Sequence, residues 1–280
     1  MSSKTPRPDS FDELCERLAR DRETMPKRLA QTATYMFGHP DEVAFGTAAT
    51  IAQAAGVQPS TLVRFAKAIG FDGFSDLQTL FRERLRDRNQ SYEVRLSALD
   101  HGSEGDEGRL LLSGFIAAGQ DSLARLEQDF DSAAFDRASA LLASAETVYL
   151  CARRRAFPPL IQMRYAFAKL GIRSEICGSI NGIDEDLLAM ATRQDAAIFV
   201  SFLPYSDQTI SMARQLKEQG VPIVSISDSP LSPLVPLSEV CFKLTEADFA
   251  GFRTQAAAIT LAMALTVAVA DKRRRHGPQA

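Results

Sequence analysis

The chain has 280 residues, with 32 Lys and Arg against 35 Asp and Glu, and therefore a net charge of −3 at pH 7. A hydrophobic fraction of 45% and a charged fraction of 24% are typical of a globular protein, and the length suggests two domains. The balanced charge excludes a chain that is basic throughout, so any contact with nucleic acid must come from a local basic face.

The four cysteines lie far apart in the sequence, without a C-x-x-C pattern or a neighbouring histidine: Cys15, Cys151, Cys177 and Cys241. This pattern predicts reduced thiols in a cytoplasmic protein, and no metal site or cofactor is indicated. The first ten residues are polar and lack the apolar core of a signal peptide. Residues 256–270 are almost wholly apolar, but they are fewer than the roughly 20 that span a membrane, so we expect a buried packing or dimer helix.

Two amphipathic helices are predicted near the N-terminus, at residues 11–18 and 26–37. Pro26 suits the start of the second helix, and His39-Pro40 is expected to stop it. Both helices present apolar stripes. They are therefore expected to complete the small core of a helical domain.

Residues 47–74, TAATIAQAAGVQPSTLVRFAKAIGFDGF, predict two short helices joined by a tight turn. Thr47 can cap the first helix, Gly56 can adopt the positive φ of the turn, and Pro59 suits the first position of the second helix. The second helix has apolar residues at the spacing of one buried face, namely Leu62, Phe65, Ala66 and Ile69. Its start and its opposite face are polar, with Gln58, Ser60, Thr61, Arg64 and Lys67.

A polar, cationic face opposite a small apolar stripe is what a DNA recognition helix needs. Its N-terminal half must reach base edges in the major groove, where Arg64 can make a bidentate contact with guanine. Ser60 and Thr61 can hold phosphates or bases. The spacing alone is equally compatible with an ordinary helical hairpin.

The segment AQAAGVQPSTLVRFAKAIGFDGFSDLQ resembles the N-terminal domain of the MurR/RpiR family of bacterial transcriptional regulators, with its pattern A-x-x-A-G-V-S-x-x-T-x-x-R-F-x-x-x-L-G-F-x-G-F. The chain departs from this pattern at Gln58, where the family has a serine cap, and at Ile69. The resemblance favours DNA binding over the plain hairpin and implies double-stranded operator DNA as a partner. The retained residues are Ala52, Ala55, Gly56, Val57, Thr61, Arg64, Phe65, Gly70, Phe71, Gly73 and Phe74.

A further helix is predicted at 75–88, where arginines alternate with acidic residues. We interpret this as a solvated face, with a phosphate contact as the alternative. The polar stretch that follows ends in HGSEGDEG and predicts a linker. The chain is thus divided into a helix-turn-helix domain at 1–88, a linker at 89–107, a second domain at 108–272 and a basic tail at 273–280.

In the second domain, short β-rich apolar runs alternate with helical ones, which indicates a parallel α/β sheet. After helices at 110–130 and 133–143, the expected strands are 147–152, 173–177, 196–201, 222–227 and 240–244, and the expected helices are 158–170, 184–192, 207–219 and 251–270. The predicted fold class is therefore an all-helical helix-turn-helix domain followed by a parallel-sheet α/β domain.

The runs DAAIFVS at 195–201, GVPIVSISD at 220–228 and SPL at 232–234 resemble a SIS (sugar isomerase) domain, the usual C-terminal partner in the MurR/RpiR family. The resemblance implies a sugar-phosphate ligand. Open parallel sheets bind ligands at the carboxyl ends of their strands, next to helix N-termini. Two loops, at 153–158 and 201–209, follow such strands.

Both loops depart from the usual SIS pattern, which has G-x-G-x-S after the first strand and S-x-S-G-x-T after the third. Three arginines replace the first motif, and the second keeps its hydroxyl residues without its glycine. Arginine binds phosphate or carboxylate through two hydrogen bonds, although an arginine run can also be a solvated loop. We predict a site for a small, anionic, sugar-related metabolite at Arg153, Arg154, Arg155, Ser201, Tyr205, Ser206 and Thr209.

Catalysis is poorly supported, because an isomerase needs a general acid and base near the sugar. All three histidines, His39, His101 and His276, lie outside the expected site. The sequence therefore predicts a DNA-binding transcriptional regulator rather than an enzyme, assembled as a homodimer or homotetramer because a two-fold protein can read a two-fold operator. The alternative is a sugar-phosphate isomerase or a related aldose–ketose enzyme.

Overall fold

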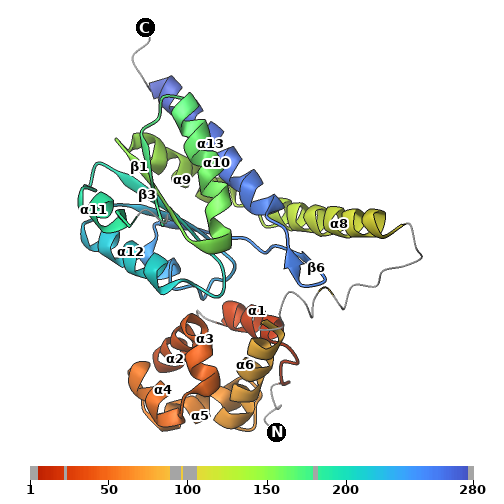
Figure 1. Ribbon diagram of the computed structural model, residues 1–280. Coiled ribbons are helices and arrows are strands. Elements are labelled where there is room, and N and C mark those ends of the chain that lie inside the picture. The colour runs from red at the N-terminus through yellow and green to blue at the C-terminus, as the bar shows by residue number, and fades with distance from the viewer. Residues whose placement is uncertain (1–5, 22–23, 89–95, 97–105, 179–181, 277–280) are drawn as a thin grey trace. The chain divides into compact units, whose positions relative to one another are not determined.

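The computed structural model describes residues 6–21, 24–88, 96, 106–178 and 182–276. The chain divides into two compact units, Met1–Asp100 and His101–Ala280, each with its own core. Most of the predicted linker at 89–107 lies outside the described residues. We describe each unit by itself (Figure 1).

The first unit is all-helical, as predicted. Its helices surround a core of fully buried apolar side chains that includes Leu14, Met36 and Phe65. Phe11 joins this core, because its ring lies 5.2 Å from those of both Phe37 and Phe81. The helices are α1 (Phe11–Asp21), α2 (Lys27–Gly38), α3 (Pro40–Phe45), α4 (Ala48–Ala54), α5 (Pro59–Ala68) and α6 (Phe74–Arg88).

Helix α3 is absent from the sequence prediction, in which Pro40 only ends the preceding helix. Pro40 is instead the first residue of α3, a position where its missing N–H costs nothing. The end of α3 is held by Gln78 of α6, whose Nε2 donates to the carbonyl oxygens of Val43 and Gly46 at 2.8 Å each. A buried amide thus supplies hydrogen bonds that a six-residue helix cannot make for itself.

The second unit contains a five-stranded parallel sheet in the order β2-β1-β3-β4-β5. The five predicted strands are all present, within a residue or two of their expected ends. They are β1 (Val148–Ala152), β2 (Ser174–Cys177), β3 (Ala196–Ser201), β4 (Ile223–Ser227) and β5 (Val240–Lys243). The helices are α8 (Glu107–Gln128), α9 (Ser132–Ser144), α10 (Phe157–Lys169), α11 (Asp184–Ala189), α12 (Asp207–Glu218) and α13 (Ala256–His276).

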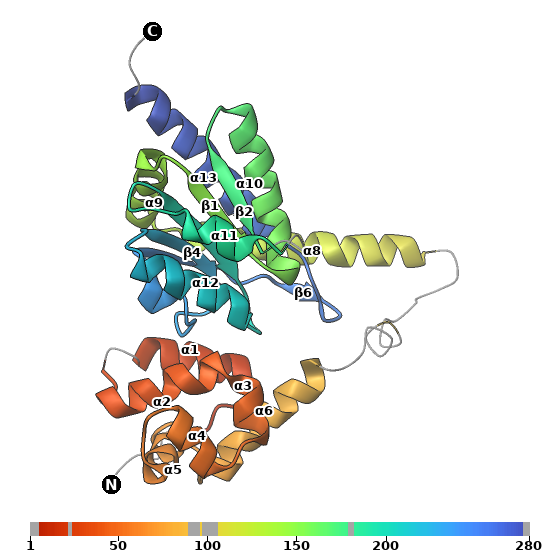
Figure 2. The ribbon, with the colours of Figure 1, turned by 60° about the vertical axis from the view of Figure 1, so that its left-hand side comes forward.

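Helices cover both faces of the sheet. On one face, side chains such as Leu150 and Ile198 pack with α9, α10 and α13, whereas on the other, Tyr149 and Phe199 pack with α11 and α12. Figures 1 and 2 show this three-layer arrangement from two sides. Because successive side chains of a strand point to opposite faces, a strand buried on both sides has no polar face, which accounts for its continuous apolar sequence.

The segment before the last helix corrects one prediction. The sequence predicts a helix from residue 251, but residues 248–253 form a small hairpin of β6 (Asp248–Phe249) and β7 (Phe252–Arg253), and α13 begins only at Ala256. The hairpin turn uses positive φ at Ala250 and Gly251, which helical spacing alone does not reveal. At its other end, α13 continues to His276, so the predicted basic tail begins inside a helix.

Helix α8 is buried along only one side. Its inner side packs on the β6–β7 hairpin, where Phe115 lies 5.5 Å from Phe249 and the Ser122 hydroxyl accepts the Ala247 N–H at 2.9 Å. Its outer side leaves large apolar residues in solvent, with Leu112 63% and Ile116 50% exposed. None of the helices in the described residues is long and apolar enough to cross a membrane.

Candidate functional site

The turn between α4 and α5 has the predicted geometry. Thr47 caps α4, with its Oγ1 accepting the Thr50 N–H at 3.1 Å, while the Thr50 hydroxyl accepts the Thr47 N–H at 3.0 Å. Gly56 has φ +65°, and the Val57 N–H bonds back to the Ala52 carbonyl at 2.9 Å. The chain therefore reverses tightly into α5, as a helix-turn-helix requires.

Two side chains of α2 hold this turn from outside, a contact that sequence reasoning missed. Gln31 donates from Nε2 to the carbonyl oxygen of Ala55 at 2.9 Å. Arg28 in turn donates to Gln31 Oε1 at 3.0 Å and lies 3.5 Å from the Gly56 carbonyl oxygen. The polar Gln31 on an otherwise apolar helix was the only signal in the sequence.

Helix α5 presents its predicted polar face to solvent. Leu62, Phe65 and Ala66 are fully buried beneath it. Of the five predicted DNA-binding residues, Thr61 is half-buried, and the other four are exposed, namely Gln58, Ser60, Arg64 and Lys67. Gln58 is the N-cap residue of α5, but its side chain makes no capping hydrogen bond, so the departure from the family's serine leaves this amide without a capping role.

In the second unit, the loops after β1 and β3 lie at the point where the sheet changes direction. The chain passes from β1 through α10 to β2 on one side, and from β3 through α12 to β4 on the other. This switch point in a 2-1-3-4-5 sheet is where a crevice opens at the carboxyl ends of the strands. The predicted ligand-binding residues lie in these two loops and at the start of α12.

The three arginines of the first loop have different environments. Arg153 forms an ion pair with Asp184, at 2.9 Å between Nη2 and Oδ2, and the Asp184 side chain is only 9% exposed. Arg155 donates to the Leu203 carbonyl oxygen at 3.0 Å and lies over the Phe202 ring at 5.2 Å. Arg154 begins a short 3-10 turn with φ +56° and is exposed.

The second loop is tied to the end of β4 through Asp228. This carboxylate accepts the Leu203 N–H at 2.8 Å and the Tyr205 hydroxyl at 3.1 Å. Burial raises the pKa of Asp228 above its ordinary value, against the opposite influence of these hydrogen bonds and of Arg155 and Arg253. Together with the bond from Arg155 to Leu203, these contacts join the loops that follow β1, β3 and β4.

The start of α12 offers polar groups that this network does not use. Ser206 is the N-cap residue, and its side chain makes no capping bond. Thr209, in the first turn, is 1% exposed, and its hydroxyl has no hydrogen-bond partner within the described residues. Ser201 is also buried, and its carbonyl oxygen accepts the Ser227 hydroxyl at 2.7 Å. A helix N-terminus with an unpaired buried hydroxyl favours an anionic ligand.

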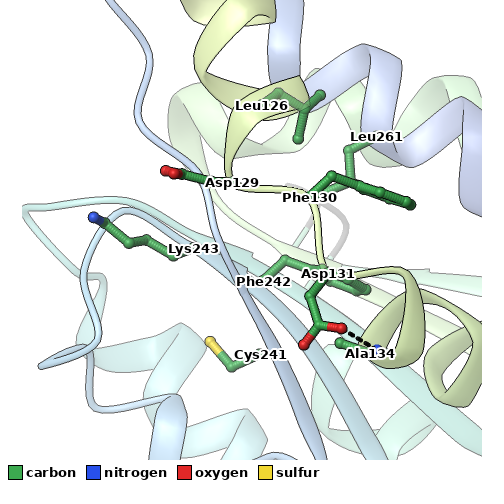
Figure 3. A pocket seen from close by; sticks show the side chains of 9 residues that line it. All are labelled: Leu126, Asp129, Phe130, Asp131, Ala134, Cys241, Phe242, Lys243 and Leu261. Atoms are coloured by element: carbon green, nitrogen blue, oxygen red, sulfur yellow. Dashed lines mark hydrogen bonds between the residues drawn. The ribbon is translucent and has the colours of Figure 1, made fainter.

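A separate cavity of about 370 Å³ lies at the other edge of the sheet, between β5 and the turn that joins α8 to α9. Figure 3 shows Cys241 and Lys243 of β5 facing this turn, where Asp131 is occupied in capping α9 through the Ala134 N–H at 2.9 Å. None of the predicted ligand-binding residues lines it. In the parts of the chain that are described, no group of three or more His, Cys, Asp or Glu side chains could hold a metal ion.

Comparisons with known proteins agree with this architecture. Residues 13–87 match the helix-turn-helix domain of the rpiR family, and residues 141–271 match the SIS domain. A curated relative, an uncharacterized HTH-type transcriptional regulator of Clostridium perfringens, is 20% identical over 215 residues, which are 76% of this chain and 75% of the relative. The chain therefore joins an rpiR-family helix-turn-helix domain to a SIS domain, and its resemblance to the MurR/RpiR regulators is confirmed in both domains.

Solved structures show the same fold for the second unit. The sugar isomerase domain of an RpiR transcription factor from Sphaerobacter thermophilus is 18% identical, with a TM-score of 0.56, and the match covers 59% of this chain and 92% of that one. A protein of E. coli CFT073, solved in complex with a sugar phosphate, is 17% identical, with a TM-score of 0.53, and the match covers 61% of this chain and 94% of that one.

Proposed function

We propose that this chain is a one-component transcriptional regulator, in which the helix-turn-helix domain binds operator DNA and the SIS domain senses a small anionic metabolite related to sugars. One observation carries the proposal: the motif of a regulator family is folded so that the polar face of α5 is exposed above a filled core. Arg64 is the group we assign to base recognition, with Lys67 and the polar residues at the start of α5 as phosphate or base contacts.

The ligand site that we propose lies at the switch point of the sheet. The structure from E. coli is a complex with a sugar phosphate, and the fold it shares supports a ligand in the corresponding region. In this chain the site would be built from the exposed Arg154, the N-terminus of α12 and the unpaired Thr209 hydroxyl. Arg153 and Arg155, which are already bonded to protein groups, would shape the loops more than they bind the ligand.

We also propose that the second unit forms a dimer or a larger assembly. The outer side of α8 carries Leu112, Ile116 and Leu123 in solvent, and on α13 Val267 is 59% exposed. Contiguous exposed apolar surface of this kind marks an interaction site. A two-fold assembly would present two recognition helices to a two-fold operator. Light scattering of the full chain should show a multiple of the 30.6 kDa monomer, and an Ile116→Ser variant should weaken the assembly.

Two assays on the same preparation distinguish a regulator from an isomerase. A mobility-shift assay with the DNA upstream of the chain's own coding region should show binding, and a turnover assay with a panel of sugar phosphates should show no interconversion. The SIS neighbour named for a sugar isomerase domain makes the second assay necessary. Turnover without DNA binding would contradict the proposal and support the alternative enzyme.

A further inference from the structure

Cys151 and Cys177 lie directly beside each other on neighbouring parallel strands. The register of β1 and β2 pairs these two residues. Both are 0% exposed, and both belong to the core on the sheet face that α11 and α12 cover. Their thiols are hydrogen-bonded to each other. Neighbouring strands are about 4.8 Å apart, which lies within the Cα separation of about 4.4–6.8 Å that a disulfide spans.

The backbone just after the two cysteines is unusually close. Gly178, which follows Cys177, has φ +98°, and a Cβ built on it would overlap the carbonyl oxygen of Ala152, which follows Cys151. Only glycine can occupy this position without moving the strand ends apart. The ends of β1 and β2 are therefore held together where the cysteines lie.

Asp184 joins the same two strand ends a second time. Its Oδ1 accepts the Gly178 N–H at 2.9 Å, and its Oδ2 accepts Arg153 Nη2 at 2.9 Å. Each cysteine is thus followed within two residues by a group that Asp184 binds. A change in the spacing of the cysteines would act on the loop that contains Arg153 and Arg154.

The other two cysteines have no such arrangement. Cys15 belongs to the first unit, and Cys241 lies on β5, the strand at the opposite edge of the sheet from β2. We propose that Cys151 and Cys177 are a redox pair, which hydroperoxides convert to a disulfide and thiol reductants restore. This inference is independent of the function proposed above.

The chemistry needs one equivalent of hydroperoxide. One cysteine sulfur attacks the O–O bond, gives two electrons to it and becomes a sulfenic acid, while the other oxygen leaves as water or alcohol. The second sulfur then attacks the sulfenic sulfur, its proton leaves with the hydroxyl as water, and the S–S bond forms. A dithiol reductant reverses the result by two successive exchanges.

Access to the pair requires a local opening, since both thiols are buried. Cys177 is the last residue of β2, a four-residue strand at the edge of the sheet, so it becomes exposed when that edge frays rather than when the unit unfolds. Burial raises the pKa of the Cys151 thiol well above its ordinary value, which keeps it protonated and makes it the poorer first nucleophile at neutral pH. We therefore expect Cys177 to react first and Cys151 to complete the disulfide.

The test uses the full chain with Cys15→Ala and Cys241→Ala, which leaves only the pair. The protein is treated with hydrogen peroxide under native conditions, remaining thiols are alkylated in denaturant, and the mass is measured before and after dithiothreitol. The expected product is lighter by two hydrogen atoms and carries no alkyl group. Non-reducing tryptic digestion should then give residues 138–153 cross-linked to residues 174–193, and the reductant should restore two alkylatable thiols.

A matched variant that also has Cys151→Ala separates pairing from simple oxidation. It should gain oxygen atoms or mixed-disulfide adducts at Cys177 and form no internal cross-link. The wild-type chain, mapped in the same way, should give the same cross-linked peptides and provides the result if the cysteine variants fold poorly. An unchanged mass, oxygen addition without a cross-link in the chain that keeps both cysteines, or a cross-link to Cys15 or Cys241 in the wild type would overturn the proposal.

Discussion

The recognition helix and the strand-end loops both carry arginines, but the two regions use them differently. Arg64 extends from a helix whose opposite face fills the core, so packing and recognition are divided between two sides of α5. In the second unit, Arg153 and Arg155 are bonded to Asp184 and to the Leu203 carbonyl. Arginines in the place of a glycine-built cradle thus take part in holding the loops together, and their number alone does not measure the capacity to bind a ligand.

The largest effect is expected at the recognition helix. Arg64→Ala should lower operator affinity about 10- to 100-fold, because losing a bidentate contact with a base costs roughly 1–3 kcal/mol. The fold should not change, since the side chain is exposed. Fluorescence anisotropy at fixed salt measures the effect, with Arg20→Ala, an exposed arginine in the last turn of α1, as the control. Equal losses in both variants would mean that α5 has no special role.

At the strand ends, the corresponding change should affect stability. Arg153→Ala leaves the carboxylate of Asp184 buried without its cation, which should lower the free energy of unfolding of the second unit by about 1–3 kcal/mol. Thermal unfolding measures the loss. Adding Asp184→Asn should recover part of it, because a neutral amide costs less to bury and its oxygen can still accept the Gly178 N–H. No recovery would show that the ion pair is not what stabilises the loop.

The two regions also differ in how much the sequence could predict. Thr47 and Gly56 act through neighbours within a few residues, so their roles in the helix-turn-helix follow from local rules. The five strands follow from continuous apolar runs. In contrast, the pairing of Arg153 with Asp184 joins residues 31 positions apart, and that of Arg155 with Leu203 joins residues 48 apart. Such partners become visible only when the sheet brings the loops together.

The missed elements have a similar cause. Helix α3 has six residues, and each strand of the β6–β7 hairpin has two, too few for a periodic pattern. Both are stabilised by distant groups: Gln78 holds the end of α3, and Phe115 of α8 packs on Phe249 of the hairpin. Short elements that depend on tertiary contacts leave little trace in their own sequence.

A smaller effect tests how far the turn positions α5. Gly56→Ala places a side chain at φ +65°, with its Cβ 3.1 Å from Gln31 Nε2, and should destabilise the turn by about 1–2 kcal/mol. Hydrogen exchange of amides in α4 and α5 should become faster, and operator affinity should fall with it. Gly73→Ala is the matched control, since no atom lies within 4 Å of its added Cβ. If both variants exchange alike, the positive φ at Gly56 does not limit the turn.

The smallest effect is expected at Arg154, and it separates a ligand-binding arginine from a structural one. Because Arg154 is exposed, Arg154→Ala should change the free energy of unfolding by no more than about 0.5 kcal/mol. It should nevertheless weaken an anionic effector by a few-fold, since a solvent-exposed ion pair contributes roughly 0.2–1 kcal/mol. Calorimetry against sugar phosphates, sugar acids and neutral polyols measures this, with Arg109→Ala, an exposed arginine of α8, as the control. If a neutral polyol bound best, or if Arg154→Ala bound the anionic effector as tightly as the wild type, the arginines of this loop would serve only to hold the strand ends together.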